Sequence, residues 1–266
     1  MKVVKQGVVH SEFHDNHLIE IRDTATQRAL FFDTEHLQSS MSFLTPQELT
    51  LSYTRFMLLG LLINQQPQNI LIIGLGAGSF VRFFHHYYPD CSIDGVDCSQ
   101  PIIDLAKGYF GLPESDNITV TCADGDLFVK QHNCGRKYDL ILVDAFDGQG
   151  MAPTIYNPAF YDRLQSLLSD DGSVSFNLWS SDKALFANIK KSLAATFHSC
   201  LFLPVPDRGN VIAVTMHHDI PWDKIDLPPK ELKAFSSRLQ LDFSQLVRIA
   251  KQNNGAIKTL LKSLFR

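Results

Sequence analysis

The chain has 266 residues, of which 45% are hydrophobic and 20% are charged, and its formal net charge at pH 7 is −4. This composition is that of a packed globular protein and excludes a disordered or collagen-like chain. The slightly acidic balance gives no support to nucleic-acid binding, whose affinity would come from the release of counterions by a basic surface.

Cysteine usage and hydropathy indicate the compartment. The cysteines are odd in number and have no C-x-x-C spacing, which disfavours a disulfide framework and a structural zinc site. They are Cys91, Cys98, Cys122, Cys134 and Cys200. The first residues are polar, and the longest apolar run, 56–63, falls short of the roughly 20 residues of a membrane helix. We therefore expect a soluble cytoplasmic protein without a signal peptide, a membrane partner or a metal site.

The first part of the chain predicts a small antiparallel β unit. β-Branched and aromatic residues gather in residues 8–43, and the clearest strands are 18–22 and 28–32, each followed by a polar turn. We place the domain boundary after this unit, which gives an N-terminal β-strand domain over residues 1–44 and a catalytic domain over residues 45–266.

Beyond the boundary, Thr45 and Pro46 combine a helix-capping residue with a proline suited to the first turn, and they predict a helix to about Asn64. From residue 69 onward strands alternate with helices, which is typical of an α/β fold with a parallel sheet. The expected strands are 69–73, 92–97, 118–121, 138–144, 173–178, 199–203 and 210–216. The expected helices are 79–88, 99–110, 125–131, 158–168, 182–196 and the tail over 228–266.

A glycine-rich turn follows the first strand of this series. Gly74, Gly76 and Gly78 allow a tight turn close to a ligand, and the next helix offers its free N–H groups there. Phe80 and Val81 follow where the dinucleotide fingerprint has a further glycine, so a nucleoside without a pyrophosphate is favoured.

Acidic residues end the next two strands, at the sheet edge where ligands bind in open parallel sheets. Asp97 can accept hydrogen bonds from ribose hydroxyls, or it can cap the helix that begins near Ser99. Asp124, followed by Gly125, can bind an adenine amino group, or it can cap the helix after it. The residues alone leave both alternatives open.

Two more carboxylates, Asp144 and Asp147, follow the fourth strand and can face one cavity. An amine that attacks a carbon bound to a sulfonium must lose a proton, so a carboxylate within hydrogen-bonding range is the expected base. The second carboxylate can hold another ammonium group, or it can form a turn with Gly148.

Together these motifs resemble the spermidine/spermine synthase family of polyamine aminopropyltransferases. The resemblance lies in residues 71–78, Asp97, Asp124-Gly125, 144–147, 157–161, and 30–33 followed by Gln38. It implies a Rossmann-like seven-stranded sheet behind a small N-terminal β unit, commonly in a homodimer. It also implies transfer of an aminopropyl group from decarboxylated S-adenosylmethionine to a small-molecule amine, with release of methylthioadenosine and no tightly bound cofactor.

The resemblance also implies roles for single residues. Asp97 would bind the ribose and Asp124 the adenine, Asp144 would be the catalytic base and Asp147 would bind the amine. The remaining two residues, Gln38 and Tyr53, would face the cleft, Gln38 toward the donor and Tyr53 toward the acceptor.

Three positions depart from the family pattern. Ala77 stands where the family has an Asp that binds the amino group of the donor, and Arg55 stands where it has an acid. The family's P-T-Y-P-x-G turn becomes residues 204–209, without its tyrosine. Two alternatives therefore stay open: an S-adenosylmethionine-dependent methyltransferase, and a module that binds adenosyl compounds without turnover.

Overall fold

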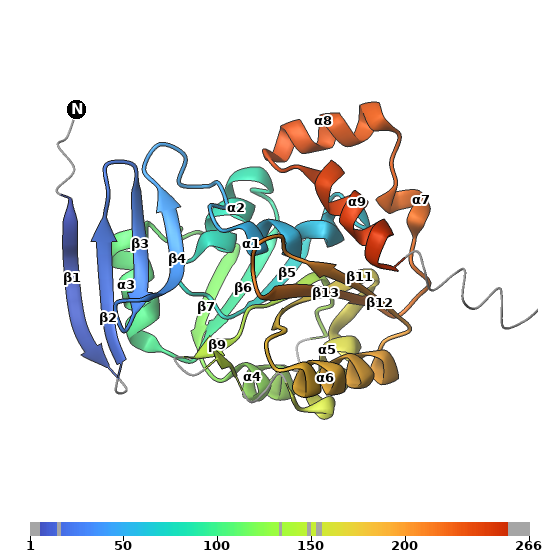
Figure 1. Ribbon diagram of the computed structural model, residues 1–266, viewed down its shortest axis with the longest axis horizontal. Helices are drawn as coiled ribbons and strands as arrows, with labels where there is room; N and C mark the ends of the chain where they lie inside the picture. Colours follow the sequence, from blue (N-terminus) through green and yellow to red (C-terminus); the bar gives the residue numbers. More distant parts are fainter. Residues whose placement is uncertain (1–5, 15–16, 133–134, 148–149, 153–155, 255–266) are drawn as a thin grey trace, which may run out of the picture.

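The computed structural model describes residues 6–14, 17–132, 135–147, 150–152 and 156–254 (Figure 1). The N-terminal unit is a four-stranded antiparallel sheet in which neighbouring strands follow the chain order. Its strands are β1 (Gly7–His14), β2 (His17–Asp23), β3 (Gln27–Phe32) and β4 (His36–Ser42). The expected antiparallel β unit is confirmed, while the domain boundary after residue 44 stays a prediction.

The helix expected from Thr45 begins later than predicted. Helix α1 (Ser52–Phe56) continues into the 3-10 helix η1 (Met57–Leu62). The segment before them is not helical, and its polar groups bond to distant parts of the fold. The Thr50 hydroxyl donates to the Ser40 carbonyl oxygen (2.9 Å), and Arg82 Nε donates to the Pro46 carbonyl oxygen (2.9 Å).

The second sheet has seven strands in the order β12-β13-β11-β8-β5-β6-β7. The strands β7, β6, β5, β8 and β11 are parallel neighbours, and β13 runs antiparallel to β11 and β12. Their bounds are β5 Asn69–Ile73, β6 Ser92–Asp97, β7 Ile118–Cys122, β8 Tyr138–Val143, β11 Leu168–Trp179, β12 Ser199–Pro204 and β13 Asn210–Met216. This arrangement confirms the expected Rossmann-like seven-stranded α/β fold.

Helices cover both faces of this sheet (Figure 1). Ile70 and Ile72 of β5 pack with η1, α2, α8 and α9 on one face, and Leu71 and Ile73 pack with α4, α5 and α6 on the other. Successive strand residues point to opposite faces, so a sheet buried on both sides needs continuous apolar strands. The helices are α2 Ser79–Tyr87, α3 Gln100–Phe110, α4 Gly125–Gln131, α5 Pro158–Leu167, α6 Lys183–Thr196, α7 Trp222–Ile225, α8 Pro229–Leu239 and α9 Phe243–Asn254.

The expectation of one helical tail from residue 228 was wrong, because the chain turns at Gln240. That residue has a positive φ of 54° and ends α8 before α9 begins. Residues 255–266, where the tail helix was expected to continue, lie outside the described part. Two short strands that the sequence did not predict, β9 (Phe146–Asp147) and β10 (Gly150–Met151), pair in the loop after β8.

The two sheets are joined where the glycine turn lies. Ile19 and Leu30 of the N-terminal sheet pack with Ala77 and Phe110 in one apolar cluster. The Arg28 guanidinium donates to the Tyr109 carbonyl oxygen (2.7 Å) across the same junction. The N-terminal sheet therefore forms a wall beside the carboxyl ends of β5 and β8, where the chain connections of the parallel sheet diverge.

Substituting Gly74 by alanine is expected to cost about 3 kcal/mol or more of unfolding free energy. Gly74 has a φ of +91°, and an added Cβ would lie 2.1 Å from the Asp144 carbonyl oxygen. Gly108→Ala is the matched control, since Gly108 lies within α3 with open space around its Cβ position. That change should stabilise the protein by about 0.5–1 kcal/mol. Urea unfolding of both variants measures the difference, and equal stabilities would contradict this packing.

Candidate active site

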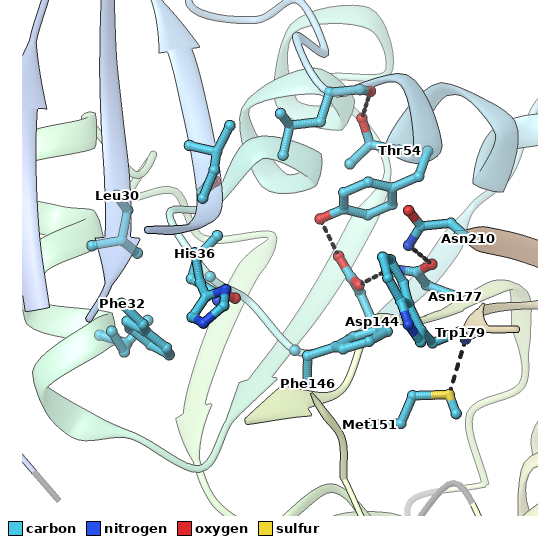
Figure 2. Close-up of a pocket in the computed structure, with 18 of the residues that line it drawn as sticks. Leu30, Phe32, His36, Thr54, Asp144, Phe146, Met151, Asn177, Trp179 and Asn210 are labelled. Carbon is cyan, nitrogen blue, oxygen red and sulfur yellow. Dashed lines mark hydrogen bonds between the residues drawn. The ribbon is translucent and has the colours of Figure 1, made fainter. Parts of the chain in front are cut away.

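A cleft of about 1090 Å³ lies between the N-terminal sheet and the carboxyl ends of the parallel strands. Six of the residues expected at the site line it: Gly74, Gly76, Asp97, Asp144, Gln38 and Tyr53. Figure 2 shows Asp144 pointing into this space between residues of the N-terminal sheet and Trp179. The acids at the ends of β6 and β8 thus share one cavity, as the strand order requires.

The three glycines of the turn differ in what they contribute. Gly76 has a φ of +51° and nothing within 4 Å of its Cβ position, so it leaves free space beside the turn. Gly78 does not line the cleft, and a Cβ there would lie 2.5 Å from Leu112. Its small size therefore serves packing, and Gly76 is the position where a ligand can approach the backbone closely.

Asp97 ties the glycine turn to the end of β6. Its Oδ2 accepts hydrogen bonds from the backbone N–H groups of Leu75 (3.0 Å) and Gly76 (3.2 Å), and its Oδ1 accepts one from Ser99 (3.0 Å). Burial raises the pKa of Asp97, and these three hydrogen bonds act in the opposite direction. The residue at the N-cap of α3 is Ser99. Asp97 faces the cleft, and its ribose role stays a prediction.

Asp124 has the capping role that the sequence left open. Its Oδ1 accepts hydrogen bonds from the backbone N–H groups of Asp126 (2.9 Å) and Leu127 (3.0 Å) at the start of α4. Asp124 is exposed, and neither it nor Gly125 is among the residues that line the cleft. A Cβ on Gly125 would lie 2.5 Å from Ile73 Cγ2, so this glycine lets α4 pack closely on β5. Adenine binding by these two residues stays a prediction.

Asp144 is held by hydrogen bonds to both of its oxygens. Tyr53 Oη donates to Oδ2 (3.0 Å), and Asn177 Nδ2 donates to Oδ1 (2.8 Å). Asn210 Nδ2 in turn donates to Asn177 Oδ1 (2.8 Å), which fixes the orientation of the Asn177 amide (Figure 2). The arrangement fixes the carboxylate while leaving each oxygen a further lone pair for a ligand.

Burial raises the pKa of Asp144 to about 6. The hydrogen bonds from Asn177 and Tyr53 lower this pKa, and the nearby charge of Asp97 adds to the increase. The pKa of Tyr53 is raised well above its usual value, chiefly by burial, so its phenol stays protonated and remains a donor. Asp144 is consequently a carboxylate able to accept a proton near neutral pH.

The sequence analysis did not identify Asn177 and Asn210 as site residues, although the sequence holds a signal for Asn177. Asn177 is buried between Phe176 and Leu178 in a strand of apolar residues. A buried amide in such a strand needs partners, and polar neighbours at a site are one source of them. Arg55, which replaces an acid of the family pattern, donates to the Leu49 carbonyl oxygen (2.7 Å) and does not line the cleft.

The far end of the cleft has an apolar wall. Trp179, whose residue surface is 41% exposed, lines it with Phe146 and Met151. The Trp179 backbone N–H donates to Met151 Sδ (3.1 Å), so the loop after β8 is held against the end of β11 (Figure 2). The side chain of Asp147, expected here as an amine ligand, lies outside the described part of the chain.

The described residues contain no group of three or more His, Cys, Asp or Glu side chains arranged to hold a metal ion. None of the described helices combines the length and the apolarity needed to cross a membrane. Around Asp144, the groups that line the cleft are a phenol, two amides and the open glycine turn.

Comparison with known proteins gives concordant matches. The model of the spermine/spermidine synthase domain matches residues 51–217. A polyamine aminopropyltransferase of Chromobacterium violaceum is 34% identical over 237 residues, covering 89% of this chain and 90% of the relative. A mouse eEF1A lysine and N-terminal methyltransferase is 31% identical over 175 residues, covering 63% of this chain and 25% of the relative. A spermidine synthase solved with the transition-state analogue AdoDATO has the same fold, with a TM-score of 0.74 and 15% identity over 95% of this chain and 87% of that one.

The raised pKa of Asp144 predicts a pH-dependent cost of keeping this carboxylate ionised. The folded protein holds the proton up to about pH 6, whereas the unfolded chain releases it near 3.8. Stability from this group is therefore lost as the pH rises from about 4 to 6, by up to about 3 kcal/mol. Asp144→Asn has no carboxyl group to ionise at this position. The unfolding free energy of the variant minus that of the unmodified protein should therefore increase between about pH 4 and pH 7. A constant difference across that range would contradict the pKa.

Proposed function

The chain belongs to the spermine/spermidine synthase family, and from this premise we propose how its cleft transfers an aminopropyl group. The protein is a transferase, and its reaction moves this group from an adenosylsulfonium donor to an amine. We propose decarboxylated S-adenosylmethionine as the donor and methylthioadenosine as the released product. The observation that supports this assignment most directly is the single cleft shared by Asp97, the open turn at Gly76 and Asp144.

The donor is proposed to lie along the ends of β5 and β6. Asp97 accepts the ribose hydroxyls, and the backbone at Gly76 leaves room for the sulfonium end of the nucleoside. Gln38, which lines the cleft from β4, contacts the donor from the opposite wall. Asp124 and Gly125 would contact the adenine from beside the cleft, which requires the base to extend toward the start of α4.

The reaction is a displacement at carbon. The lone pair of the acceptor nitrogen attacks the methylene carbon bound to sulfur, the carbon–sulfur bond breaks, and its electron pair stays on sulfur as a neutral thioether. The attacking nitrogen must first be neutral, and we propose that Asp144 accepts its proton. Desolvation lowers the pKa of a bound ammonium and raises that of Asp144 to about 6, so the two approach one another. Tyr53 and Asn177 hold the carboxylate in place, and alignment of nitrogen and carbon supplies the rest.

The role of Asp147, the compartment and the oligomeric state are proposed from the family and the sequence. We propose that Asp147 contacts the acceptor, that the enzyme works in the cytoplasm and that it forms a homodimer. The free thiols of Cys91 and Cys200 agree with a reducing compartment. The outer strand β1 exposes Val8 (55%) and Phe13 (71%), which gives a second copy an apolar strand to cover.

The activity is tested by incubating the protein with decarboxylated S-adenosylmethionine or S-adenosylmethionine and an amine. Methylthioadenosine is the expected product, whereas S-adenosylhomocysteine would identify methyl transfer and binding without either product would identify a non-catalytic module. Asp144→Asn should lower turnover by about 10²- to 10⁴-fold, because the proton acceptor is lost. Its affinity for methylthioadenosine should stay roughly unchanged.

Asp97→Ala is the complementary control for that experiment. It should weaken methylthioadenosine binding by about 1–3 kcal/mol, because a charged hydrogen-bond acceptor is removed. Full turnover in Asp144→Asn, or unchanged nucleoside affinity in Asp97→Ala, would remove that residue from its proposed role.

The pH dependence of kcat/KM provides a separate prediction. Activity should rise with pH through about 6 as Asp144 ionises. Tyr53→Phe removes a hydrogen bond that stabilises the carboxylate, so the pKa of Asp144 should increase and the acid limb should move to higher pH. Ionisation of the free amine is common to both proteins and cancels in the comparison. An unmoved acid limb would show that Asp144 does not control it.

A further inference from the structure

The acceptor end of the cleft carries a cation and an anion that do not pair with each other. Arg208 and Asp182 both line it. Arg208 lies in the loop between β12 and β13, and Asp182 lies just after β11. In the sheet order these strands are on the side of β8 away from β5 and β6, where the donor is proposed to bind. The two charges therefore face the acceptor half of the cleft.

The Arg208 guanidinium has no hydrogen bond, ion pair or aromatic partner among the described residues. Its backbone is nevertheless well fixed, because the Arg208 N–H donates to the Val205 carbonyl oxygen (3.3 Å) and Asp207 has a φ of +57° in the turn between them. A Cβ on Gly209 would lie 2.8 Å from the Trp179 ring, so the loop lies directly against this indole. The turn therefore holds an exposed arginine, without a protein partner among the described residues, beside the apolar wall of the cleft.

Asp182 presents an unpaired oxygen at the same end. Its Oδ1 accepts a hydrogen bond from the Leu185 backbone N–H (2.9 Å) at the start of α6, while its Oδ2 has no partner among the described residues. Asp182 and Arg208 make no ion pair with each other although both line the cleft. Both side chains are exposed, so each can exchange water for a ligand group of the opposite charge.

We propose that the acceptor is a diamino carboxylic acid, an inference that rests on the proposed aminopropyl transfer. Its carboxylate pairs with Arg208, its α-ammonium pairs with Asp182, and its side-chain amine reaches Asp144 as the nucleophile. The methylene spacer lies along the Trp179 indole, whose exposed surface suits an alkyl chain. A guanidinium offers the planar, two-pronged donor that a carboxylate accepts best.

The pairing of Arg208 distinguishes this class from a simple diamine. Arg208 is the one Lys or Arg side chain among the described residues that line the cleft, where it lies with the carboxylates of Glu35, Asp97, Asp144 and Asp182. A diamine leaves this guanidinium without a partner, whereas the carboxylate of an amino acid gives it one. A phosphate-bearing amine fits less well, because Asp182 would repel its second negative charge. The zwitterionic head group of an amino acid satisfies both residues.

The reaction with this acceptor is the same displacement at carbon. The side-chain nitrogen forms its bond to the methylene carbon as the carbon–sulfur bond breaks. The proton of the attacking amine goes to Asp144, and methylthioadenosine leaves as a neutral thioether. The α-amino group stays protonated at Asp182 and is not alkylated, which fixes the position of transfer on the acceptor.

Binding to the protein saturated with methylthioadenosine tests the proposal without requiring turnover. Calorimetric titration compares ornithine, which has the full head group, with 5-aminopentanoic acid, which lacks the α-ammonium, and putrescine, which lacks the carboxylate. Ornithine should bind about tenfold or more tightly than putrescine. Arg208→Gln should weaken ornithine and 5-aminopentanoic acid by about tenfold and leave putrescine unchanged or improved. Asp182→Asn should weaken ornithine but not 5-aminopentanoic acid.

The controls separate charge from folding. Asparagine caps a helix about as well as aspartate, so Asp182→Asn keeps the start of α6 intact. Arg248→Gln removes an exposed arginine of α9 that does not line the cleft, and it should change none of the three affinities.

Two outcomes overturn the proposal while leaving aminopropyl transfer in place: putrescine binding as tightly as ornithine, or equal losses of both ligands in Arg208→Gln. Parallel turnover assays with decarboxylated S-adenosylmethionine report on the reaction itself. If no acceptor releases methylthioadenosine, the proposed function fails, and the binding comparison still decides which head group the cleft recognises.

Discussion

The desolvated carboxylate of Asp144 is the constraint on which the rest of the site depends. Its main chain lies so close to β5 that only glycine fits at position 74, and its side chain is fixed by a phenol and an amide from two other elements. Burial raises its pKa to about 6, and two hydrogen bonds keep the ionised form accessible near neutral pH. A carboxylate with this pKa needs fixed hydrogen-bond donors to stay in place, and Asn177, itself oriented by Asn210, supplies one of them.

The N-terminal sheet completes that site. The parallel sheet supplies the glycine turn and Asp144, but one side of the cleft would be open to water without β1–β4. Packing of the N-terminal sheet onto the glycine turn and α3 closes it. Residues of the N-terminal sheet and the loops that carry Asp182 and Arg208 therefore line one cleft.

Much of this architecture could be predicted because its signals are local. Continuous apolar strands ending in glycine or Asp placed the parallel sheet and brought Asp97 and Asp144 to one edge. The late start of α1 at Ser52 could not be predicted, because the preceding residues form hydrogen bonds with Ser40 and Arg82, which lie elsewhere in the fold. The hydrogen bond from Asn177 to Asp144 joins strands that are far apart in the sequence, so no local pattern indicates it. The end of α8 at Gln240 depends on a left-handed residue that is not a glycine, so the usual sequence signal is missing.

A crystal structure of the protein with methylthioadenosine and an amine tests the central claim most directly. The account predicts the ribose hydroxyls on Asp97, the thioether sulfur beside the backbone of Gly76, and the amine nitrogen within hydrogen-bonding distance of Asp144. A nucleoside bound outside the cleft between the two sheets, or an amine that makes no contact with Asp144, would contradict it.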